Sequence, residues 1–217
     1  MNKLLKFASY FFDIPLKKVH SQYSDEVQVS VHLGQYKLST KNAIYSFGKK
    51  YTSFETAIQQ IKSKQRIQQV LVLGFGLGSV VDLLENHINI KKIVAVDADK
   101  IILQLAQRYS QAKLKNKVNY VCDDAIHFIQ NNTSVFDLVL VDLFIDDKTP
   151  KQFLETSFLN QLKKSVAQNG ILIFSKLDDS QENKNENALF ENHFSNIFNE
   201  SYAIETDGNK LFIWKNN

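Results

Sequence analysis

Val70-Leu71-Val72-Leu73-Gly74-Phe75-Gly76-Leu77-Gly78 is the stretch that decides the fold class of this chain. Four consecutive apolar residues end on glycine, and Ser79 to Leu84 continue with helical spacing, which predicts a buried strand, a glycine turn and a helix. Glycine adopts positive φ and allows a ligand to approach the backbone closely. The turn therefore predicts a cofactor cradle at the end of the strand, although the same glycines suit a tight turn without a ligand.

The alternation of apolar runs and helical patterns continues on the C-terminal side of this stretch. Further strands are expected at 93–96, 118–121, 136–141 and 171–174, with helices at 99–109 and 125–129. Runs that are apolar throughout are typical of strands covered by helices on both faces. The sequence thus predicts an α/β fold with a doubly wound, Rossmann-like and mostly parallel sheet.

The C-terminal end breaks this alternation. Apolar runs at 202–206 and 211–214 flank Asp207-Gly208, a dipeptide that favours a tight hairpin turn. A helix is expected before them at 188–198, and the polar stretch at 178–187 is interpreted as a mobile loop. The sheet is therefore predicted to close with an antiparallel C-terminal hairpin.

The N-terminal part has a different pattern. Residues 1–50 are predicted to form a small β unit and residues 51–217 the Rossmann-like domain. Alternating residues from Glu26 to Phe47 indicate three short antiparallel strands, and Ser53 is expected to cap a helix running to about Lys64. The valines at positions 27 to 31 are expected to be exposed, which would permit two chains to pair as a homodimer.

Composition and charge exclude several classes of protein. Hydrophobic residues make up 44% of the 217 residues and charged residues 23%, the balance of an ordinary globular protein. The net charge of +3 comes from dispersed lysines, so no concentrated basic face for nucleic acid is expected. The single cysteine, Cys122, and the wide spacing of the histidines predict neither a disulfide framework nor a metal site.

No targeting or membrane-spanning segment is expected. The apolar run from Phe7 to Phe12 is cut short by Asp13 and Pro15, and no cleavage pattern follows it. No run reaches the roughly 18 apolar residues that a spanning helix needs. Together with the lone cysteine, these features predict a cytoplasmic protein that binds a small molecule, without a membrane or nucleic-acid partner.

Acidic residues stand where the next two strands end. Asp97 ends the second predicted strand, 19 positions after Gly78, where a carboxylate can accept hydrogen bonds from both hydroxyls of a ribose. Asp99 is the better candidate for the cap of the next helix. Asp123 and Asp124 end the third strand. Asp124 is predicted to accept from an adenine amino group, with helix capping as the alternative.

Three further acids follow the fourth predicted strand. Asp142 ends that strand, and Asp146 and Asp147 lie in the loop after it. In a doubly wound sheet the ligand cleft lies beyond the carboxyl ends of the strands, so these acids are expected to face whatever reacts with the cofactor. They could hold a cationic amine substrate and take its proton. Alternatively, they could be solvent-exposed acids at the edge of the cleft without a role in the reaction. Asp142 is the predicted catalytic residue.

The segments 70–80, 93–100, 122–128 and 136–150 together resemble the spermidine synthase family and its class I S-adenosylmethionine-dependent methyltransferase relatives. The third glycine, two residues after the second, also fits the methyltransferase form of the loop. The resemblance implies S-adenosylmethionine, or its decarboxylated form, as the cofactor. It implies the following roles: Gly74, Phe75, Gly76 and Gly78 in cofactor binding, Asp97 with Ala98 at the ribose, Asp124 with Ala125 at the adenine, and Asp142 nearest the reacting amine.

Two departures from the family bear on the reaction. Aminopropyltransferases carry a glutamine and a tyrosine-histidine-glutamate motif before the first sheet strand. Here residues 41–61 lack that pattern and offer Tyr45, Tyr51, Phe54 and Glu55. The family also places a second acid three residues after the first, where this chain has Ile145.

These observations leave three hypotheses for the function. The first is a methyltransferase on a spermidine-synthase-like scaffold, with an unknown acceptor. The second is an aminopropyltransferase that uses decarboxylated S-adenosylmethionine and a polyamine, which the departures disfavour. The third is a non-catalytic cofactor-binding module. A nicotinamide dehydrogenase is disfavoured by the glycine spacing and by the closing hairpin.

Overall fold

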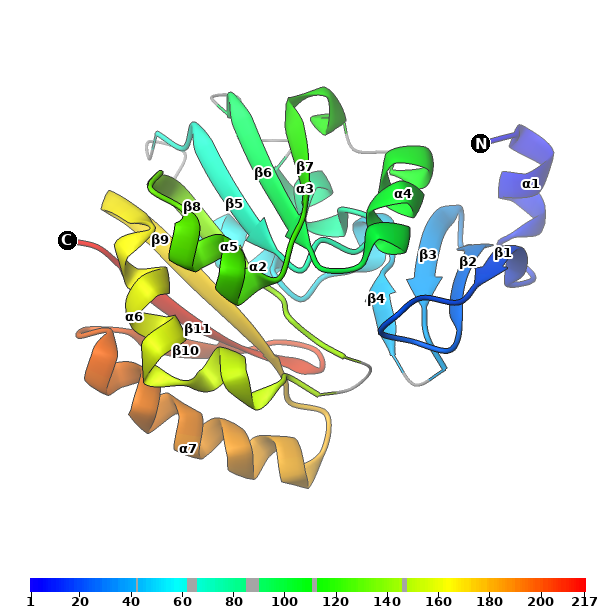
Figure 1. Ribbon diagram of the computed structural model, residues 1–217. Coiled ribbons are helices and arrows are strands. Elements are labelled where there is room, and N and C mark those ends of the chain that lie inside the picture. The colour runs from blue at the N-terminus through cyan, green and yellow to red at the C-terminus, as the bar shows by residue number, and fades with distance from the viewer. Residues whose placement is uncertain (42, 62–65, 85–89, 111–112, 146–147) are drawn as a thin grey trace.

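The computed structural model describes residues 1–41, 43–61, 66–84, 90–110, 113–145 and 148–217. The described residues form two β-sheets: a four-stranded antiparallel sheet near the N-terminus and a seven-stranded sheet formed by the later strands (Figure 1). The large sheet and its helices confirm the predicted Rossmann-like α/β fold, and the small sheet confirms the N-terminal β unit.

The large sheet has the strand order β10-β11-β9-β8-β5-β6-β7. Strands β9, β8, β5, β6 and β7 run parallel, whereas β11 pairs antiparallel with β9 and β10 pairs antiparallel with β11. The chain thus winds from β5 outward to β7 and then crosses to β8 on the other side, as in a doubly wound fold. The strands are β5 (Gln69–Leu73), β6 (Lys92–Asp97), β7 (Val118–Cys122), β8 (Phe136–Val141), β9 (Val166–Leu177), β10 (Tyr202–Glu205) and β11 (Asn209–Lys215).

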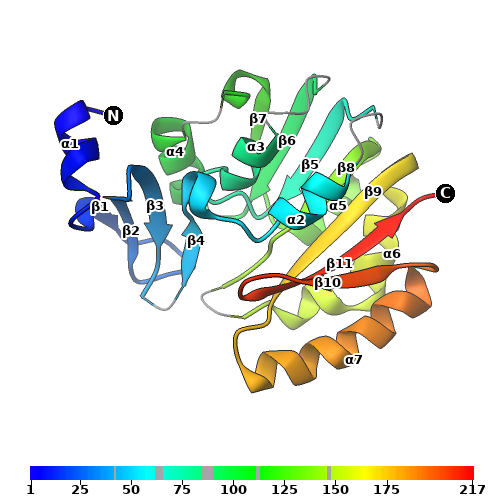
Figure 2. The same cartoon turned by 180° about the vertical axis from the view of Figure 1, so that it is seen from behind.

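Helices cover both faces of the large sheet (Figures 1 and 2). Helices α2, α3 and α4 pack on one face and α5, α6 and α7 on the other. The helices are α1 (Lys3–Ala8), α2 (Glu55–Gln60), α3 (Ser79–Leu83), α4 (Lys100–Tyr109), α5 (Ala125–Asn131), α6 (Thr156–Lys164) and α7 (Gln181–Ile197), with 3-10 turns at Gly48–Lys50, Lys115–Lys117 and Lys151–Leu154.

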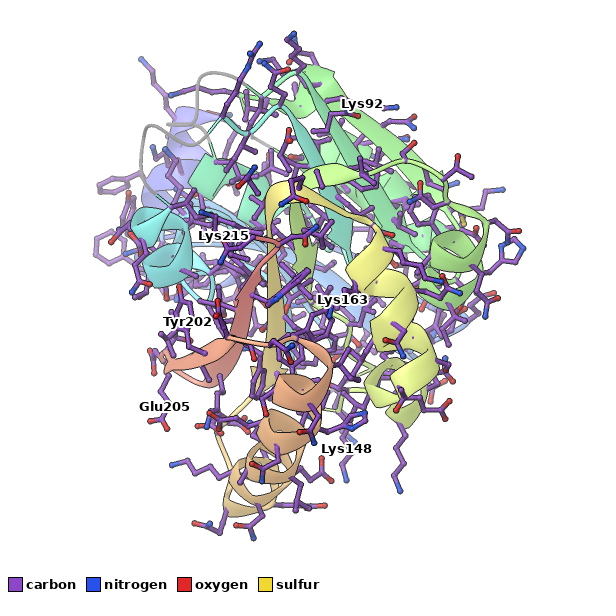
Figure 3. All side chains as sticks on the ribbon, turned by 90° about the vertical axis from the view of Figure 1, so that its left-hand side faces the viewer. Lys92, Lys148, Lys163, Tyr202, Glu205 and Lys215 are labelled. Carbon is purple, nitrogen blue, oxygen red and sulfur yellow. The ribbon has the colours of Figure 1, made fainter. Side chains whose placement is uncertain are left out.

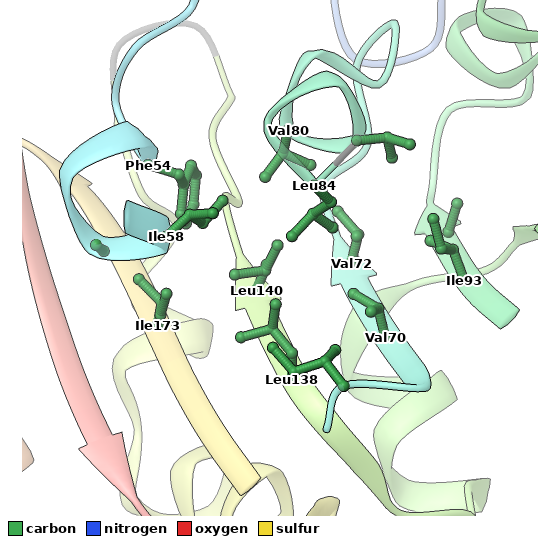
Figure 4. Packing of buried hydrophobic residues seen from close by; sticks show 14 of the residues in the cluster. Phe54, Ile58, Val70, Val72, Val80, Leu84, Ile93, Leu138, Leu140 and Ile173 are labelled. Atoms are coloured by element: carbon green, nitrogen blue, oxygen red, sulfur yellow. The ribbon is translucent and has the colours of Figure 1, made fainter. Parts of the chain in front are cut away.

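Alternating residues of the central strand β5 pack into two separate hydrophobic clusters. Val70 and Val72 face the cluster that contains Ile58 of α2 (Figure 4). Leu71 and Leu73 face the opposite cluster. All four are completely buried. Because a strand covered on both faces is apolar at every position, this run was recognisable from the sequence.

The small sheet has one strand more than predicted. Its order is β1-β2-β3-β4, with β1 at one edge. Most residues of β1 are exposed and do not alternate between apolar and polar, so the sequence carried no strand signal there. The strands are β1 (Ile14–Val19), β2 (Val27–His32), β3 (Gln35–Ser39) and β4 (Ile44–Ser46).

The prediction that the valines of β2 are exposed is wrong. Val27, Val29 and Val31 are all completely buried. Val27 and Val29 pack in one cluster with Leu77 and with Ile102 of α4. The apolar face of β2 is therefore turned toward α4 and covers it. These valines are not available for pairing two chains.

The start of α2 also differs from the prediction. The helix begins at Glu55, is preceded by Phe54, and has no side-chain cap. Ser53 does not cap it, because the Ser53 hydroxyl donates to Asn209 Oδ1 at 3.0 Å instead. The helix ends at Gln60, and the predicted end near Lys64 lies outside the described residues.

The predicted loop at 178–187 is wrong, because α7 begins at Gln181. Ser180 caps this helix by accepting from the Asn183 N–H at 3.1 Å. Only the second half of α7 buries large apolar side chains, Phe190 and Phe194. The first half is anchored instead by the buried amide of Asn187, which donates to Leu177 O and Asp178 Oδ1 at 2.8 Å each. Helical hydrophobic periodicity was therefore not visible in this stretch.

Replacing Ser180 by alanine should destabilise the protein modestly. The Ser180→Ala change removes the acceptor for the Asn183 N–H and should cost about 1 kcal/mol. For a chain of this size that lowers the melting temperature by about 2 to 4 °C in calorimetry. Ser195→Ala on the exposed face of the same helix is the control and should leave the melting temperature nearly unchanged. Equal effects of the two changes would contradict the capping role.

The C-terminal hairpin confirms the prediction. Gly208 in its turn has φ +81°, and β11 lies between β9 and the edge strand β10. Tyr202 and Glu205 on β10 point to solvent at this edge (Figure 3). Within the described part of the chain, none of the helices has the length and apolar character required to cross a bilayer.

Candidate functional site

A cleft lies at the carboxyl ends of the parallel strands. This is where the doubly wound topology separates the connections that follow β5 and β8, so neither covers the strand ends. The cleft is closed on one side by residues of the small sheet and its connections. Its described lining residues are Tyr23, Ser24, Tyr45, Tyr51, Gly74, Gly76, Val96, Asp97, Ala98, Asp99, Ile102, Asp123, Asp124, Ala125, Asp142, Leu143, Phe144, Ile145, Gln152 and Phe153.

The glycine loop after β5 has positive φ at Gly74, Gly76 and Gly78, with values of 81°, 54° and 84°. A Cβ on Gly74 would lie 2.1 Å from the Asp142 carbonyl oxygen, and one on Gly76 would lie 2.8 Å from the Tyr45 carbonyl oxygen. These two glycines are therefore required by close approach of other backbone segments as well as by backbone conformation. The loop brings β5, β8 and the small sheet together at the cleft.

Asp97 links the end of β6 to the glycine loop. Its Oδ2 accepts from the Phe75 N–H at 3.0 Å, and its Oδ1 accepts from the Asp99 N–H at 3.0 Å. Burial raises the pKa of Asp97 to about 6, against the opposing effect of these N–H donors. Each carboxylate oxygen has a second lone pair. The group can therefore hold the loop and still accept from a ligand hydroxyl.

Asp99 caps α4, as predicted. Its Oδ1 accepts from the Ile101 N–H at 2.8 Å. Its Oδ2 is buried and has no hydrogen-bond partner among the described residues. Because Asp99 lines the cleft, this oxygen is a further acceptor that a bound ligand could satisfy.

Asp123 and Asp124 lie side by side after β7 with different partners. Asp124 Oδ1 accepts from the N–H groups of Ile126 and His127, so Asp124 caps α5. Asp123 contacts the His127 ring nitrogen Nδ1 at 2.8 Å. The capping alternative for Asp124 is thus realised, and its other oxygen is left for a ligand. Its contact with an adenine stays a prediction.

Asp142, at the end of β8, is paired with a tyrosine from the other side of the cleft. The Tyr51 hydroxyl donates to Asp142 Oδ2 at 2.7 Å. Burial raises the pKa of Asp142 to about 6, although the Tyr51 hydroxyl and the nearby Ser175 hydroxyl oppose this rise. Burial and the Asp142 charge raise the pKa of Tyr51 well above its usual value. Near neutral pH the pair is therefore a carboxylate held by a protonated phenol.

The cleft brings together most of the predicted site residues. Gly74, Gly76, Asp97, Ala98, Asp124, Ala125 and Asp142 all line it. Phe75 packs behind it, with its ring against Tyr120 at 5.5 Å between centroids, and Gly78 directly precedes α3. Asp146 and Asp147 lie outside the described residues. The binding roles of all these residues remain predictions.

Sequence reasoning did not assign Tyr51, Tyr23 or Ser24 to the site. Tyr23 and Ser24 come from the connection between β1 and β2, where the Gln22 side chain donates to the Ala98 carbonyl at 3.4 Å. Tyr51 is 91 positions from its partner Asp142. No spacing rule links residues that far apart, so only the folded chain shows these contributions.

The cleft is strongly acidic. Five aspartates line it: Asp97, Asp99, Asp123, Asp124 and Asp142. No lysine or arginine is among its described lining residues. Carboxylates gathered in a cleft with few compensating cations favour a positively charged ligand.

The fold and the cleft define a Rossmann-like α/β protein with an acidic ligand site at the carboxyl ends of its strands. Residues 56–205 match the family model described as the spermine/spermidine synthase domain. The chain therefore belongs to this family.

Curated relatives carry two different activities in their names. The chain is 28% identical over 160 residues to an eEF1A lysine and N-terminal methyltransferase homolog of Drosophila melanogaster, covering 69% of this chain and 23% of the relative. It is 24% identical over 154 residues to a polyamine aminopropyltransferase of Vibrio vulnificus, covering 67% and 50%. The chain thus spans half or less of the length of these two relatives.

Solved structures share the fold at low sequence identity. Spermidine synthase from Thermotoga maritima superimposes with a TM-score of 0.75 at 12% identity, covering 94% of this chain and 73% of that one. Human methyltransferase-like protein 13 in complex with SAH gives a TM-score of 0.61 at 18% identity, covering 76% and 81%. Both likenesses extend over most of this chain and concern the fold alone.

Proposed function

We propose that this chain is an S-adenosylmethionine-dependent methyltransferase that acts on an amine. The observation that carries the proposal is the pair of Asp142 and Tyr51, which opens into the same cleft as the glycine loop and Asp97. A proton acceptor is thereby placed beside the predicted cofactor cradle. The methyltransferase homolog among the relatives supports this reaction class.

The residues of the cleft fit an adenosine cofactor. Asp97 retains lone pairs for two ribose hydroxyls beyond its bonds to the backbone. Asp124 retains one oxygen for an adenine amino group, and the neighbouring Ala125 leaves room beside it. The unsatisfied Oδ2 of Asp99 is a further acceptor in the same region. S-Adenosylmethionine, when bound, supplies a methyl group activated by its sulfonium sulfur.

Asp142 is proposed to accept the proton that the amine loses. S-Adenosylmethionine would supply the methyl group, and an amine nitrogen that receives it would become positively charged and have a proton to lose. Asp142 then takes the proton through whichever oxygen the amine reaches. Tyr51 holds the carboxylate in place through Oδ2. Positioning and proton transfer are the two contributions that this chemistry needs from the protein.

An aminopropyltransferase is the second candidate. The excess of aspartates in the cleft favours it, because decarboxylated S-adenosylmethionine carries two positive charges and a polyamine carries several. Against it stands Ile145, which lines the cleft where the family has its second acid. A non-catalytic binding module is the third alternative.

Ligand-induced stabilisation separates the two transferase candidates. S-Adenosylmethionine at about 100 times its dissociation constant should stabilise the folded chain by about 2.7 kcal/mol. Melting temperatures are measured with S-adenosylmethionine, its decarboxylated form, methylthioadenosine and NAD, and NAD should have no effect. A response to decarboxylated S-adenosylmethionine and methylthioadenosine, but not to the parent compound, would favour the aminopropyltransferase. A response to none of the four would overturn the proposal of an adenosine cofactor.

The proposed setting is the cytoplasm, with a small cationic amine as substrate and no nucleic-acid partner. The single cysteine, Cys122, is free and exposed, as in proteins of a reducing compartment. A homodimer remains part of the proposal, although the valines of β2 cannot mediate it. Exposed aromatic side chains on α1 and after it, Phe7, Phe11 and Phe12, offer another surface for self-association.

A further inference from the structure

Three buried polar side chains lie behind Asp142, away from the open cleft. Ser53, Ser175 and Asn209 are 6%, 0% and 5% exposed. They come from the residues before α2, from β9 and from β11. Ser175 is the neighbour of Asp142 across the sheet, because the preceding residues Val141 and Phe174 are paired in the parallel ladder between β8 and β9.

The hydrogen bonds of these three side chains run in one direction, from Ser53 through Asn209 to Ser175. The Ser53 hydroxyl donates to Asn209 Oδ1 at 3.0 Å, which fixes the orientation of the amide. The amide nitrogen of Asn209 then donates to Ser175 Oγ at 3.0 Å. Ser175 has accepted a hydrogen bond and retains its own proton to donate.

Asp142, the neighbour of Ser175 across the sheet, offers a carboxylate oxygen as the acceptor for that proton. Asp142 Oδ1 is buried and has no hydrogen-bond partner within standard geometry among the described residues, while Oδ2 accepts from Tyr51. We propose that Asn209 is a positioning residue for Asp142: by donating to Ser175, it directs the Ser175 hydroxyl proton at Asp142 Oδ1. The inference rests on the proposed function only in that Asp142 is the proton acceptor there.

A purely structural explanation accounts poorly for these residues. On the same face of β11, the positions that follow Asn209 are Leu211 and Ile213, which pack in the hydrophobic cluster of α2 and α3. An apolar residue at position 209 would fill the same kind of space without a polar group to satisfy. Three polar side chains joined by hydrogen bonds are therefore better explained by the carboxylate that they approach.

The ionised form of Asp142 depends on neutral hydrogen-bond donors, because the neighbouring lysines do not face it. Among the residues that the structure describes, Tyr51 is the titratable group that hydrogen-bonds to Asp142, and Asp97 is the other cleft carboxylate with a raised pKa. Lys176, next to Ser175, lies on the opposite face of β9 with its ammonium 5.4 Å from the centroid of the Phe190 ring. Lys210, next to Asn209, pairs with Glu191 at 2.7 Å. Neither lysine faces the carboxylate.

Loss of the directed hydroxyl should make Asp142 easier to protonate. A hydrogen bond donated to a carboxylate stabilises its ionised form and lowers the pKa, so removal of the donor raises it. In Asn209→Leu and Ser175→Ala, the proton affinity of Asp142 should increase roughly tenfold, which is about one pH unit. Ser53→Ala should have a smaller effect in the same direction, because the Asn209 amide loses the bond that orients it.

The test is a carbon-13 NMR titration of the full chain labelled at the aspartate carboxyl carbons. The Asp142 resonance is assigned by its disappearance in Asp142→Asn. Tyr51→Phe is the positive control and should raise the midpoint, because it removes the other donor. Ser165→Ala, a buried serine outside this group, is the negative control and should leave the midpoint unchanged.

An unchanged Asp142 midpoint in Ser175→Ala and Asn209→Leu, with Tyr51→Phe shifted, would overturn the inference. If Asn209→Leu does not fold, Ser175→Ala alone decides, since it removes only one buried hydroxyl. The titration uses neither cofactor nor acceptor. Failure of the proposed function would appear separately, as absence of S-adenosylmethionine binding to the wild-type chain. The titration of Asp142 would still show whether Asn209 and Ser175 affect its pKa.

Discussion

Asp142→Asn should abolish methyl transfer while leaving cofactor binding nearly intact. The asparagine keeps the size of the side chain and still accepts from Tyr51, but it cannot take a proton from the amine. General-base catalysis is worth roughly 100-fold to 10,000-fold in rate, and a loss within that range is expected. Transfer from labelled S-adenosylmethionine is measured with putrescine, spermidine and peptides that contain lysine or a free N-terminus. Affinity for the cofactor, measured by calorimetry, should change less than about threefold, since less than 0.7 kcal/mol is at stake.

A matched control lies on the same strand. Asp137, near the start of β8, accepts from the Gln68 and Gln69 N–H groups at the end of the sheet remote from the cleft. Asp137→Asn makes the same chemical change outside the site and should leave transfer unchanged. Unchanged turnover in Asp142→Asn would contradict the assigned role.

The same carboxyl group gives the reaction a pH dependence. Because the pKa of Asp142 is about 6 and the ionised form is the base, the rate should rise with pH up to about 6 and then level off.

The contribution of Asp142 to stability should fall with rising pH, whereas the rate rises. A folded-state pKa raised from 3.8 contributes stability that is fully present below pH 4 and is lost as the pH rises through about 6. Above pH 6, Asp142→Asn should therefore melt at a higher temperature than the wild type, and near pH 4 the difference should disappear.

Gly74→Ala should produce the largest loss of stability. An alanine Cβ would lie 2.1 Å from the Asp142 carbonyl oxygen, and it would impose a side chain on a residue with φ +81°. The backbone at the end of β8 would have to move to relieve the clash. The combined cost should exceed about 4 kcal/mol, the range of severe single substitutions. That corresponds to a melting temperature at least about 8 °C lower.

Gly208→Ala separates the two causes of this loss. Gly208 has the same φ of +81°, but a Cβ there would meet no atom within 4 Å. Its cost should be only the backbone strain of about 1 to 3 kcal/mol. If both variants lost the same stability, the close approach of the glycine loop to β8 would not be what requires Gly74.

The elements that the sequence predicted well are those buried on both faces. Residues 70–73 and 136–141 are apolar at nearly every position, because helices cover both sides of β5 and β8. The positions of Asp97 and Asp142 at the cleft followed from the same strands, since parallel strands end at one edge of the sheet. The start of α7 was missed because hydrogen bonds of Ser180 and Asn187, instead of apolar periodicity, hold it in place.

The orientation of the small sheet was a matter of tertiary packing. Alternation in β2 indicated one apolar face, but the sequence could not show whether that face covers α4 or remains exposed. The structure places Val27 and Val29 against Ile102. A period of two defines the faces of a strand and says nothing of what each face meets.

By itself, the sequence determined the Rossmann-like sheet, the glycine turn after β5, the closing hairpin and the row of acids at the strand ends. All of these depend on local sequence pattern, because buried strands, tight turns and strand ends each favour particular residue types at nearby positions. Tertiary structure alone decided that Tyr51 binds Asp142, that Gly74 is held against β8, and that Asn209 and Ser175 lie behind the carboxylate. These contacts join residues far apart in sequence, and the physical reason is that a hydrogen bond or a close approach depends on distance in space, which no spacing along a single chain encodes.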